Sequence, residues 1–504
     1  MKKNDTCKNL KFEDCELAIL RQAVDIAEEK QGKIAAKSPE IKRIIGIVET
    51  FLKQKQLICY GGTAINNILP KQDQFYNKDV EIPDYDFFSW NALTNAKELV
   101  DLYIKEGFVE VEAKSGQHHG TYKVYVNFIP VADISYIPKE LFNALKKEAI
   151  KVSGLLYAPP NYLRMSMYLE LSRPDGDVSR WEKVLKRLTL LNRNYPLSAH
   201  QCSHIDFQRK LSSGATEAKN NGINDDINDD GTNGDGTNGD GINVGKGFHK
   251  SRTPFNKSEQ IYETVKSTLM DQGVVFFGGY SVSLYSQYMP GHLRKRLEKI
   301  PDFDVLAEDP LIVSQIVKER LQDINVKNVK IMKRPAVGEI IAPHYEIRVG
   351  NDVIAFIYEP LACHSYNVLK QQGYDIKVAT IDTMLSFYLA FLYANRPYYD
   401  KNRILCMSKY LFEVQEKNRL QQKGLLKRFS INCVGHQETV EEMRAEKTEK
   451  FAELKDKKKT PEYDAWFLRY RPLDAKEMDE AKKAKTKRTK KTKRKTKKRK
   501  GLFF

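Results

Sequence analysis

Two aspartates, Asp84 and Asp86, lie two residues apart in the apolar, strand-like run VEIPDYDFFSW (80–90). Because side chains alternate along a strand, both carboxylates are expected on the same face. Two ionised carboxylates side by side in an apolar setting repel each other unless cations lie between them. Mg²⁺ (or Mn²⁺) is the expected ion, because it takes hard oxygen ligands and commonly bridges carboxylates and substrate phosphates. A polar strand face paired with lysines is the alternative interpretation.

A third acid, Asp133, lies in the apolar run FIPVADISYI, where a carboxylate without a partner is costly. If this run forms a strand beside the one that carries Asp84, three carboxylates converge and can hold two metal ions. In such a site one ion activates an attacking hydroxyl and the other stabilises the leaving oxygen.

A glycine pair, Gly61-Gly62, precedes the acids in the stretch LICYGGTAINNIL (57–69), between a short apolar strand and a helix-like run. Backbone amides at such a turn, together with the helix N-terminus, can hold outgoing phosphates. A tight turn without a ligand is the alternative, and the glycines alone do not decide between the two.

The segments that position these residues alternate between helical and strand periodicity. Residues 39–56 carry apolar side chains at helical spacing, and residues 95–108 form a second amphipathic pattern. The runs FVEVEA, TYKVYVNF and IPVADISYI are typical of strands, and helical patterns dominate from Pro138 to about Asn192. This order predicts an α/β (α+β) fold, in which a small mixed sheet is followed by a helical subdomain.

The second half of the chain repeats this layout. The stretch VVFFGGYSVSLY places Gly278 and Gly279 after an apolar run, and IPDFDVL, with Asp302 and Asp304, resembles IPDYDFF. Further along, MLSFYLAFLYANRP resembles RMSMYLELSRP of the first half. These matches occur in the same order in both halves, which predicts an internal duplication.

Charge is concentrated at one end of the 504 residues, a length that is enough for two or three domains. Residues 481–500 hold 14 Lys or Arg and no acid, whereas the formal net charge of the whole chain is +17. Such a polycation binds polyanions through counterion release; a solvated tail or a nuclear-import signal is the alternative. Residues 214–247 are rich in Gly, Asn, Asp and Thr and are expected to form a disordered linker.

The seven cysteines include no CxxC pair, which favours a reducing compartment over a disulfide framework. The clusters AHQCSHID (199–206) and CVGH (433–436) each lack a full set of four zinc ligands, so no zinc site is expected there. The chain has no run of 18 apolar residues, and MKKNDTCKNLKFEDC at its start has no apolar core. Neither a membrane span nor a secretory signal is therefore expected.

Gly61-Gly62, Asp84-Tyr85-Asp86 and Asp133 together resemble the signature of the polymerase-β-like nucleotidyltransferase superfamily. The stretches YGGTAIN, IPDYDFFS and NYLRMSMYLELSRPDGDVSRWEKVLKRLTLLNRNYP are similar to the poly(A) polymerase catalytic subunits of large nucleocytoplasmic DNA viruses, of the giant-virus, asfarvirus and poxvirus type. The resemblance covers most of residues 40–200 and, more weakly, residues 260–415.

The resemblance implies a reaction in which an RNA 3′-hydroxyl attacks the α-phosphate of ATP. Pyrophosphate leaves, and AMP is added to the RNA 3′ end without a template, as in polyadenylation of viral mRNA. By the same resemblance Asp84 and Asp86 would ligate both ions, and Asp133 would ligate the ion that activates the hydroxyl. The residues implied to contact the triphosphate are Gly61, Gly62 and Thr63.

The helical run RWEKVLKRL carries an apolar stripe that includes Trp181 and Leu188, with basic side chains pointing elsewhere. Lys183 is expected to contact a phosphate, because relatives place a lysine on this segment. A solvated basic face is expected for Lys186 and Arg187.

The second copy is expected to lack one metal ligand. Aligning VADISYIP with VIAFIYEP places Ala355 opposite Asp133, and no other acid lies in that run before Glu359. Without a third carboxylate the hydroxyl-activating ion is poorly held. We expect a degenerate copy that is kept for packing or RNA binding; an active second site is the alternative.

These expectations give a duplicated polymerase-β-like nucleotidyltransferase fold, each copy followed by a helical subdomain. The predicted segments in chain order are an N-terminal helical segment (1–38), the nucleotidyltransferase catalytic core (39–137), a helical subdomain (138–212), a low-complexity insertion (213–250), a degenerate nucleotidyltransferase-like domain (251–360), a C-terminal helical region (361–475) and a basic tail (476–504).

The partners implied are an RNA 3′ end, ATP, and either a second copy of the chain or a separate processivity partner. The expected location is the host cytoplasm, a viral factory or the virion, without secretion or a membrane. Two alternatives stay open: another RNA nucleotidyltransferase, of the uridylyl- or CCA-adding type, and a catalytically inactive RNA-binding scaffold.

Overall fold

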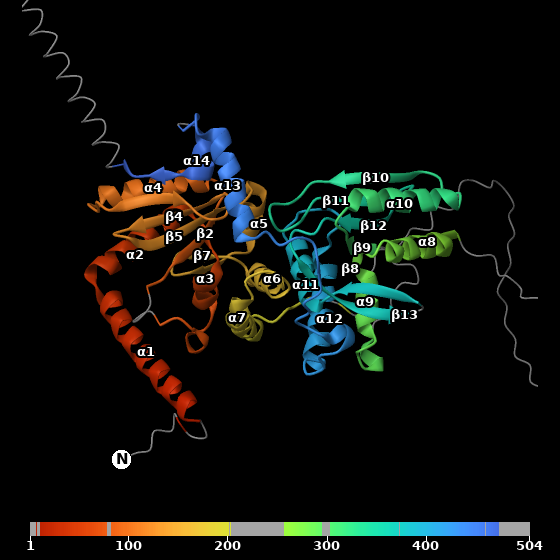
Figure 1. The fold of residues 1–504 in the computed structure, drawn as a ribbon, viewed down its shortest axis with the longest axis horizontal. Helices are drawn as coiled ribbons and strands as arrows, with labels where there is room; N and C mark the ends of the chain where they lie inside the picture. Colours follow the sequence, from red (N-terminus) through yellow and green to blue (C-terminus); the bar gives the residue numbers. More distant parts are fainter. Residues whose placement is uncertain are drawn as a thin grey trace, which may run out of the picture.

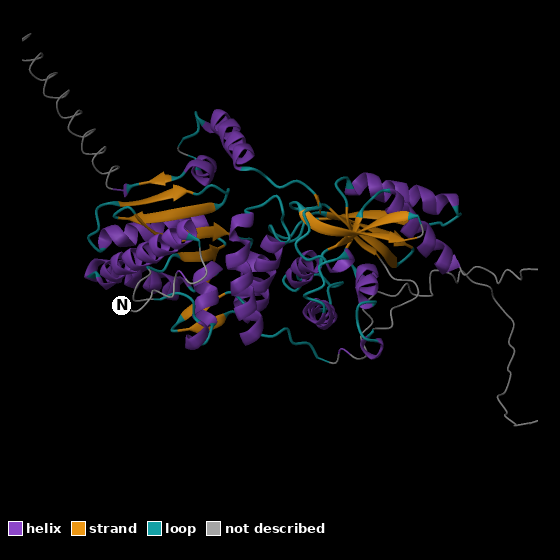
Figure 2. Ribbon diagram, turned by 60° about the horizontal axis from the view of Figure 1, so that its bottom comes forward, coloured by secondary structure: helices purple, strands orange, loops and turns teal. Residues whose placement is uncertain are grey.

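The computed structural model has two lobes, each built on an eight-stranded mixed sheet (Figure 1). Figure 2 shows the two sheets side by side, with helices between and around them. The expected insertion (213–250), the basic tail (476–504) and Asp302 lie outside the described part of the chain. The described residues are 7, 11–77, 82–200, 202, 257–294, 303–371, 373–458 and 460–472.

The first sheet has the strand order β16-β3-β4-β5-β2-β1-β7-β6. Its strands are β1 (Ile58–Cys59), β2 (Tyr85–Ser89), β3 (Val111–Ser115), β4 (Thr121–Val126), β5 (Ile129–Tyr136), β6 (Ile150–Val152), β7 (Leu155–Tyr157) and, from the other end of the chain, β16 (Arg469–Tyr470). The helices in this half are α1 (Phe12–Lys37), α2 (Pro39–Lys55), α3 (Gly61–Ile68), α4 (Ala92–Lys105), α5 (Lys139–Glu148), α6 (Pro160–Leu171) and α7 (Trp181–Asn194).

The second sheet has the strand order β10-β11-β12-β9-β8-β14-β13-β15. Its strands are β8 (Val275–Phe276), β9 (Phe303–Leu306), β10 (Val329–Arg334), β11 (His344–Val349), β12 (Asp352–Tyr358), β13 (His364–Gln371), β14 (Tyr374–Ala379) and β15 (Cys433–Val434). The helices in this half are α8 (Lys257–Asp271), α9 (Gly279–Ser286), α10 (Pro310–Asp323), α11 (Ile381–Phe391), α12 (Lys401–Lys417), α13 (Val440–Leu454) and α14 (Pro461–Phe467).

Seven neighbouring strands of the first sheet correspond to seven of the second in their order and in their relative directions. In both sheets a central parallel pair, β2 with β5 or β9 with β12, continues on one side into two antiparallel strands. On the other side comes a short antiparallel strand and then a parallel one. The predicted mixed α/β class is confirmed. Descent of the two halves from one ancestor stays a prediction, since topology alone does not measure ancestry.

The amphipathic segments of the first lobe form helices whose apolar faces pack into its core. On α4 the side chains of Ala96, Leu99, Val100 and Tyr103 recur at helical spacing, and all four are buried. The central strand β2 has buried residues at four of its five positions, so it lies covered on both faces. Between the lobes, α6 packs against both α7 and α11, which joins the two helical regions (Figure 1).

A β-hairpin made of β6 and β7 interrupts the run of helices that was predicted after Pro138. β7 pairs in parallel with β1, the strand that leads into the glycine turn. Each hairpin strand has only three residues, which is too short for a periodic pattern. The hairpin therefore depends on pairing with a strand about 100 residues earlier in the chain, which local sequence does not encode.

The C-terminal segment, defined here as residues 427–472, crosses from the second lobe to the first. β15 adds to the second sheet beside β13, whereas β16 adds to the first sheet beside β3. Between them α13 and α14 lie against the first lobe (Figure 1, blue). A 2.6 Å ion pair between Lys97 and Asp464 and a 2.9 Å hydrogen bond from the Tyr470 hydroxyl to Asp101 fasten this end.

Six cysteines are joined in disulfides, and the described chain leaves the buried Cys59 free. The expectation that a disulfide framework is absent is therefore wrong, whereas the reducing compartment stays a prediction. The partners lie 8, 204 and 70 residues apart, so tertiary structure brings together the second and the third pair. The pairs are Cys7–Cys15, Cys202–Cys406 and Cys363–Cys433. Within the described ranges, no helix combines the length and the apolar character that a bilayer crossing requires.

Candidate active site

Parallel pairing of β2 with β5 brings the predicted acids together. Asp86 on β2 is the cross-strand neighbour of Asp133 on β5, so both side chains leave the sheet on the same face. Asp84 directly precedes β2 and lies two residues before Asp86. All three aspartates line one cleft of about 2270 Å³. The convergence expected from the sequence is present; the role of each acid stays a prediction.

Gly61 and Gly62 form the first turn of α3, directly against these acids. Gly61 has a φ of +71°, and a Cβ at this position would lie 2.5 Å from Oδ2 of Asp86. Only glycine meets both conditions without strain. The Thr63 hydroxyl donates a 2.8 Å hydrogen bond to the carbonyl oxygen of Asp84, which fastens the helix to the acidic strand. The glycine is thus required for the close approach of backbone and carboxylate.

The electrostatics of the three acids favour a cation among them. Burial, followed by the charges of Asp84 and Asp133, raises the pKa of Asp86 to about 7. Partial desolvation in the cleft, and then the charge of Asp133, also raise the pKa of Asp84, although this residue is exposed. Oδ1 of Asp133 is buried without a hydrogen-bond partner, while its Oδ2 accepts a hydrogen bond from Lys123. Surplus negative charge and an unused oxygen are what a hard divalent cation neutralises, so the residues present fit such an ion.

Lys123 on β4 is a residue of the site that the sequence did not reveal. It is the cross-strand neighbour of Asp133, forms an ion pair with it, and lines the same cleft. Side chains alternate along TYKVYVNF, so Lys123 lies on the face opposite to the buried Tyr122 and Val124. This alternation is the one feature of the sequence that indicates where Lys123 points. The identity of its partner depends on the pairing of β4 with β5.

Arg180, just before α7, is a second cleft residue that was not predicted. Its Nε lies 3.1 Å from Oε1 of Glu170, and both residues line the cleft. Its positive charge opposes the rise in the pKa of Asp86.

Helix α7 places the predicted Lys183 on the cleft wall. Val184 and Leu188 are buried, as the apolar stripe predicted, while Lys183 is exposed and lines the cleft. Lys186 pairs with Glu182 at 2.6 Å on the solvent side, which agrees with the solvated face expected for it.

Arg187 does not belong to that solvated face, so this expectation is wrong. Its Nη2 donates a 2.6 Å hydrogen bond to the Tyr76 hydroxyl, and its guanidinium stacks near the Phe75 and Tyr76 rings. A Cβ at Gly62 would lie 2.9 Å from its Nη1. Helical spacing put Arg187 near Lys183, but only the packing of α7 against α3 shows that it reaches the glycine turn.

The second lobe repeats the contact between glycine and acid. A Cβ at Gly278 would overlap Oδ2 of Asp304. The sheet register pairs Asp304 with Phe356, whereas Ala355 pairs with Phe303. The expected match of Ala355 with Asp133 is therefore wrong by one residue, because a gapless alignment of short apolar runs cannot fix strand register. The position that Asp133 holds is occupied by a phenylalanine.

A buried glutamate marks the other change in the second lobe. Glu346 on β11 is the cross-strand neighbour of Phe356, as Lys123 is of Asp133. It is fully buried and pairs with Arg334 at 2.6 Å and with Arg348. In the second lobe an acid thus takes the place of Lys123, and a phenylalanine takes the place of Asp133.

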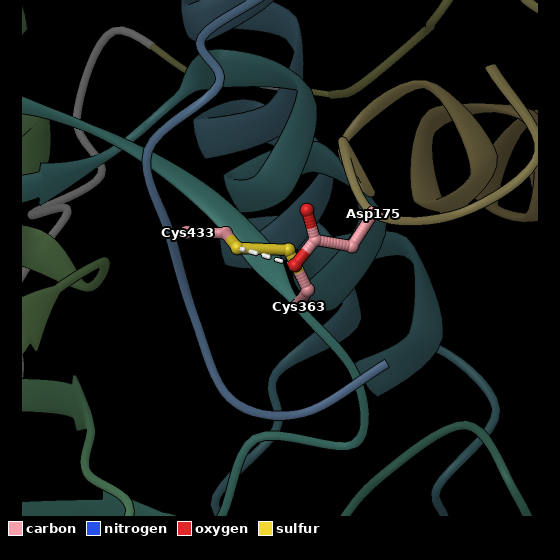
Figure 3. A group of neighbouring side chains, drawn as sticks. All are labelled: Asp175, Cys363 and Cys433. Atoms are coloured by element: carbon pink, nitrogen blue, oxygen red, sulfur yellow. Dashed lines mark hydrogen bonds between the residues drawn. A yellow bond between two sulfur atoms is a disulfide. The ribbon is translucent and has the colours of Figure 1, made fainter. Parts of the chain in front are cut away.

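Asp175, Cys363 and Cys433 form a group whose potential ligand atoms lie within 4.8 Å of one another (Figure 3). The two sulfurs are bonded to each other, and the Asp175 carboxylate lies 3.6 Å from the Cys433 sulfur. Cysteine binds metals as a thiolate, so in this form only the carboxylate is available. The group is a disulfide link between β15 and Cys363, the residue directly before β13.

The family of poly(A) polymerase catalytic subunits matches residues 46–177, which contain the glycine pair and all three acids. Residues 46–177 are thus similar to that family. A putative poly(A) polymerase catalytic subunit of African swine fever virus (strain Badajoz 1971 Vero-adapted) is 33% identical over 171 residues, 33% of this chain and 36% of the relative. That of Acanthamoeba polyphaga mimivirus is 28% identical over 176 residues, 34% of this chain and 28% of the relative.

The match to the poly(A) polymerase family spans about a third of the length of the curated relatives. The fold likeness extends further. The crystal structure of the Megavirus polyadenylate synthase superposes with a TM-score of 0.69 and 17% identity, covering 90% of this chain and 84% of that one. At this identity the likeness shows a shared fold, which includes both lobes. The predicted resemblance to viral poly(A) polymerase catalytic subunits is confirmed.

Proposed function

We propose that this chain adds AMP from ATP to RNA 3′ ends without a template and releases pyrophosphate. One observation carries the proposal: Asp84, Asp86 and Asp133 converge beside Gly61, within a segment that is similar to the poly(A) polymerase family. The names of the viral relatives support AMP as the transferred group.

The three aspartates would hold two divalent ions, Mg²⁺ or Mn²⁺. Asp84 and Asp86 would ligate both ions, and Asp133 would ligate the one on the side of the attacking hydroxyl. The raised pKa of Asp86 and the unpartnered oxygen of Asp133 support this assignment, since a bound cation satisfies both. When bound, such ions supply Lewis-acid activation of the hydroxyl and neutralise charge on the leaving pyrophosphate.

The first turn of α3 and the basic face of α7 are suited to the triphosphate. The backbone amides of Gly61, Gly62 and Thr63 lie at a helix start, where anions bind favourably. The Arg187 guanidinium beside Gly62 and the Lys183 ammonium on the same wall would add positive charge. As the RNA 3′-oxygen bonds to the α-phosphorus, the bond to pyrophosphate breaks and the leaving charge develops near these groups.

A primer-extension assay tests this proposal against both alternatives. Purified protein is incubated with a single-stranded RNA primer, Mg²⁺ and one of the four nucleotides at a time. Long tails with ATP alone are expected. Extension with UTP, or limited addition of C and A, would indicate the other transferase classes. No extension by the folded protein with any nucleotide would favour an RNA-binding scaffold.

Within this proposal the second lobe is a degenerate copy of the first, kept for packing or RNA binding. The shared strand order and the repeated contact of glycine with acid support common descent. Phe356 in place of the third carboxylate supports the loss of metal binding.

The proposed partners are the RNA 3′ end and ATP, with a processivity partner or a second copy of the chain. The word "subunit" in the names of the relatives supports such a partner. The basic residues 481–500 would retain RNA between additions, and the site of action would be the host cytoplasm, a viral factory or the virion.

A further inference from the structure

We infer that Lys123 is a positioning residue with two successive partners, an inference that rests on the proposed function. Before cations bind, its ammonium holds the Asp133 carboxylate in place. Once cations neutralise Asp133, the ammonium contacts a backbone phosphate near the RNA 3′ end.

The geometry of the pair supports the first of these roles. Lys123 and Asp133 are cross-strand neighbours on β4 and β5, and Nζ of Lys123 contacts Oδ2 of Asp133. The Asp133 side chain is 16% exposed, and that of Lys123 is 38% exposed. A carboxylate this buried needs a partner in order to keep one orientation. Lys123 supplies that partner and still has one side open to the cleft.

The second role follows from competition for the same carboxylate. A divalent cation on Asp133 removes the negative charge that attracts the ammonium, and then repels it. Lysine has a flexible stem and a compact charge, so its ammonium can turn to another anion in the cleft. In the proposed reaction Asp133 lies on the side of the RNA 3′-oxygen, and the nearest phosphodiester of the RNA is only one nucleotide away.

The second lobe supplies an internal comparison. There the acid is replaced by Phe356, and the lysine position is taken by Glu346, which Arg334 and Arg348 hold. The lysine is thus absent where the acid is absent. This is the pattern expected of a lysine whose role depends on the acid beside it.

The first measurement is cation binding to the nucleotide-free protein. Mn²⁺ is titrated calorimetrically into wild-type protein and into Lys123→Met, Lys123→Arg and Lys114→Met. Lys114 is the matched control, because it lies beside Lys123 on β3 but pairs with Glu112 and does not line the cleft. Loss of the competing ammonium should tighten Mn²⁺ binding roughly twofold to fivefold in Lys123→Met, the scale of a partly exposed ion pair. Mn²⁺ binding by Lys123→Met that equals binding by the wild-type protein would overturn the first role.

The second measurement is RNA binding as a function of salt. A fluorescent single-stranded RNA is titrated in Mg²⁺ without ATP, and binding is followed by anisotropy. Lys123→Met should lower the slope of log K against log salt by about 0.7, the value for one phosphate of a single strand. Lys123→Arg should keep the wild-type slope, and Lys114→Met should change neither slope nor Mn²⁺ affinity.

Equal salt slopes for Lys123→Met and Lys114→Met would overturn the second role. That outcome is distinguishable from failure of the proposed function. The function fails if the wild-type protein does not extend RNA with ATP. The inference fails alone if wild-type protein extends RNA while Lys123→Met behaves as the control in both titrations.

Discussion

In the first lobe Asp86 faces Asp133 across a parallel strand pair, and in the second Asp304 faces Phe356 across the equivalent pair. Both lobes keep a glycine so close to the acid that a Cβ has no room. The backbone framework is therefore the same, and the difference lies in how charge is balanced on it. Around Asp86 negative charge exceeds what Lys123 and Arg180 neutralise, whereas two arginines neutralise Glu346.

This difference in charge balance distinguishes a lobe that keeps only the backbone framework from one that has a candidate active site. A carboxylate that is already held by guanidinium groups has no need of a metal ion, and its place in the fold is fixed. Carboxylates that lie together in a cleft and are only partly neutralised attract divalent cations, which is what the proposed chemistry requires. The glycine turn is thus necessary for the site but does not distinguish an active lobe from an inactive one.

The largest expected effect comes from removing one acid in each lobe. Asp84→Ala should lower AMP transfer roughly a thousandfold, because a lost ligand weakens ions that stabilise the transition state by several kcal/mol. Asp304→Ala should leave transfer per folded molecule within about twofold. Steady-state primer extension with ATP measures both, and circular dichroism checks the fold. If Asp304→Ala removes transfer from a folded protein, the assignment of the lobes is reversed.

A smaller effect is expected from adding a methyl group to the two glycine turns. Gly61→Ala should lose about 1–2 kcal/mol of stability from its positive φ, and it should also slow transfer because the new Cβ displaces the Asp86 carboxylate. Gly278→Ala should be destabilised by about 1–3 kcal/mol through crowding against Asp304. Urea unfolding with parallel activity assays separates the two, since only Gly61→Ala should show slower transfer per folded molecule. Equal transfer by both variants would contradict the comparison.

A pH dependence is also expected, and it belongs to the first lobe. The pKa of the Asp86 carboxyl is 3.8 in the unfolded chain and about 7 in the folded protein, so the folded protein binds an extra proton between these values. Stability of the metal-free protein should therefore fall as pH rises from about 4 to about 7. Thermal unfolding in a chelator measures this slope, and Asp86→Asn should flatten it. Saturating Mg²⁺ should also flatten it; an identical slope in Asp86→Asn and wild type would contradict the assignment.

Much of the site could be predicted because its signals are local. Alternation placed Asp84 and Asp86 on a strand, and burial cost marked Asp133 as unusual. Register could not be predicted in the same way, so Phe356 and not Ala355 occupies the equivalent position. Two short apolar runs can be aligned in neighbouring registers with similar quality, while a folded sheet allows only one.

Residues whose roles depend on distant pairing were also missed. The role of Lys123 depends on the pairing of β4 with β5, and that of Arg187 depends on the position of α7 beside α3. The hairpin β6–β7 and the strands β15 and β16 are two or three residues long, below the length at which periodicity is visible. Disulfides between cysteines 70 and 204 residues apart are equally invisible to a search for local spacing.

The pairing of β16 with β3 has a consequence for synthesis on the ribosome. Most of the first sheet is complete once residue 157 has emerged, yet β3 pairs with Arg469–Tyr470, made more than 300 residues later. Until then the edge of β3 exposes unpaired backbone groups, the kind of surface on which nascent chains associate wrongly. The last described strand of the chain thus closes an edge that one of the earliest left open.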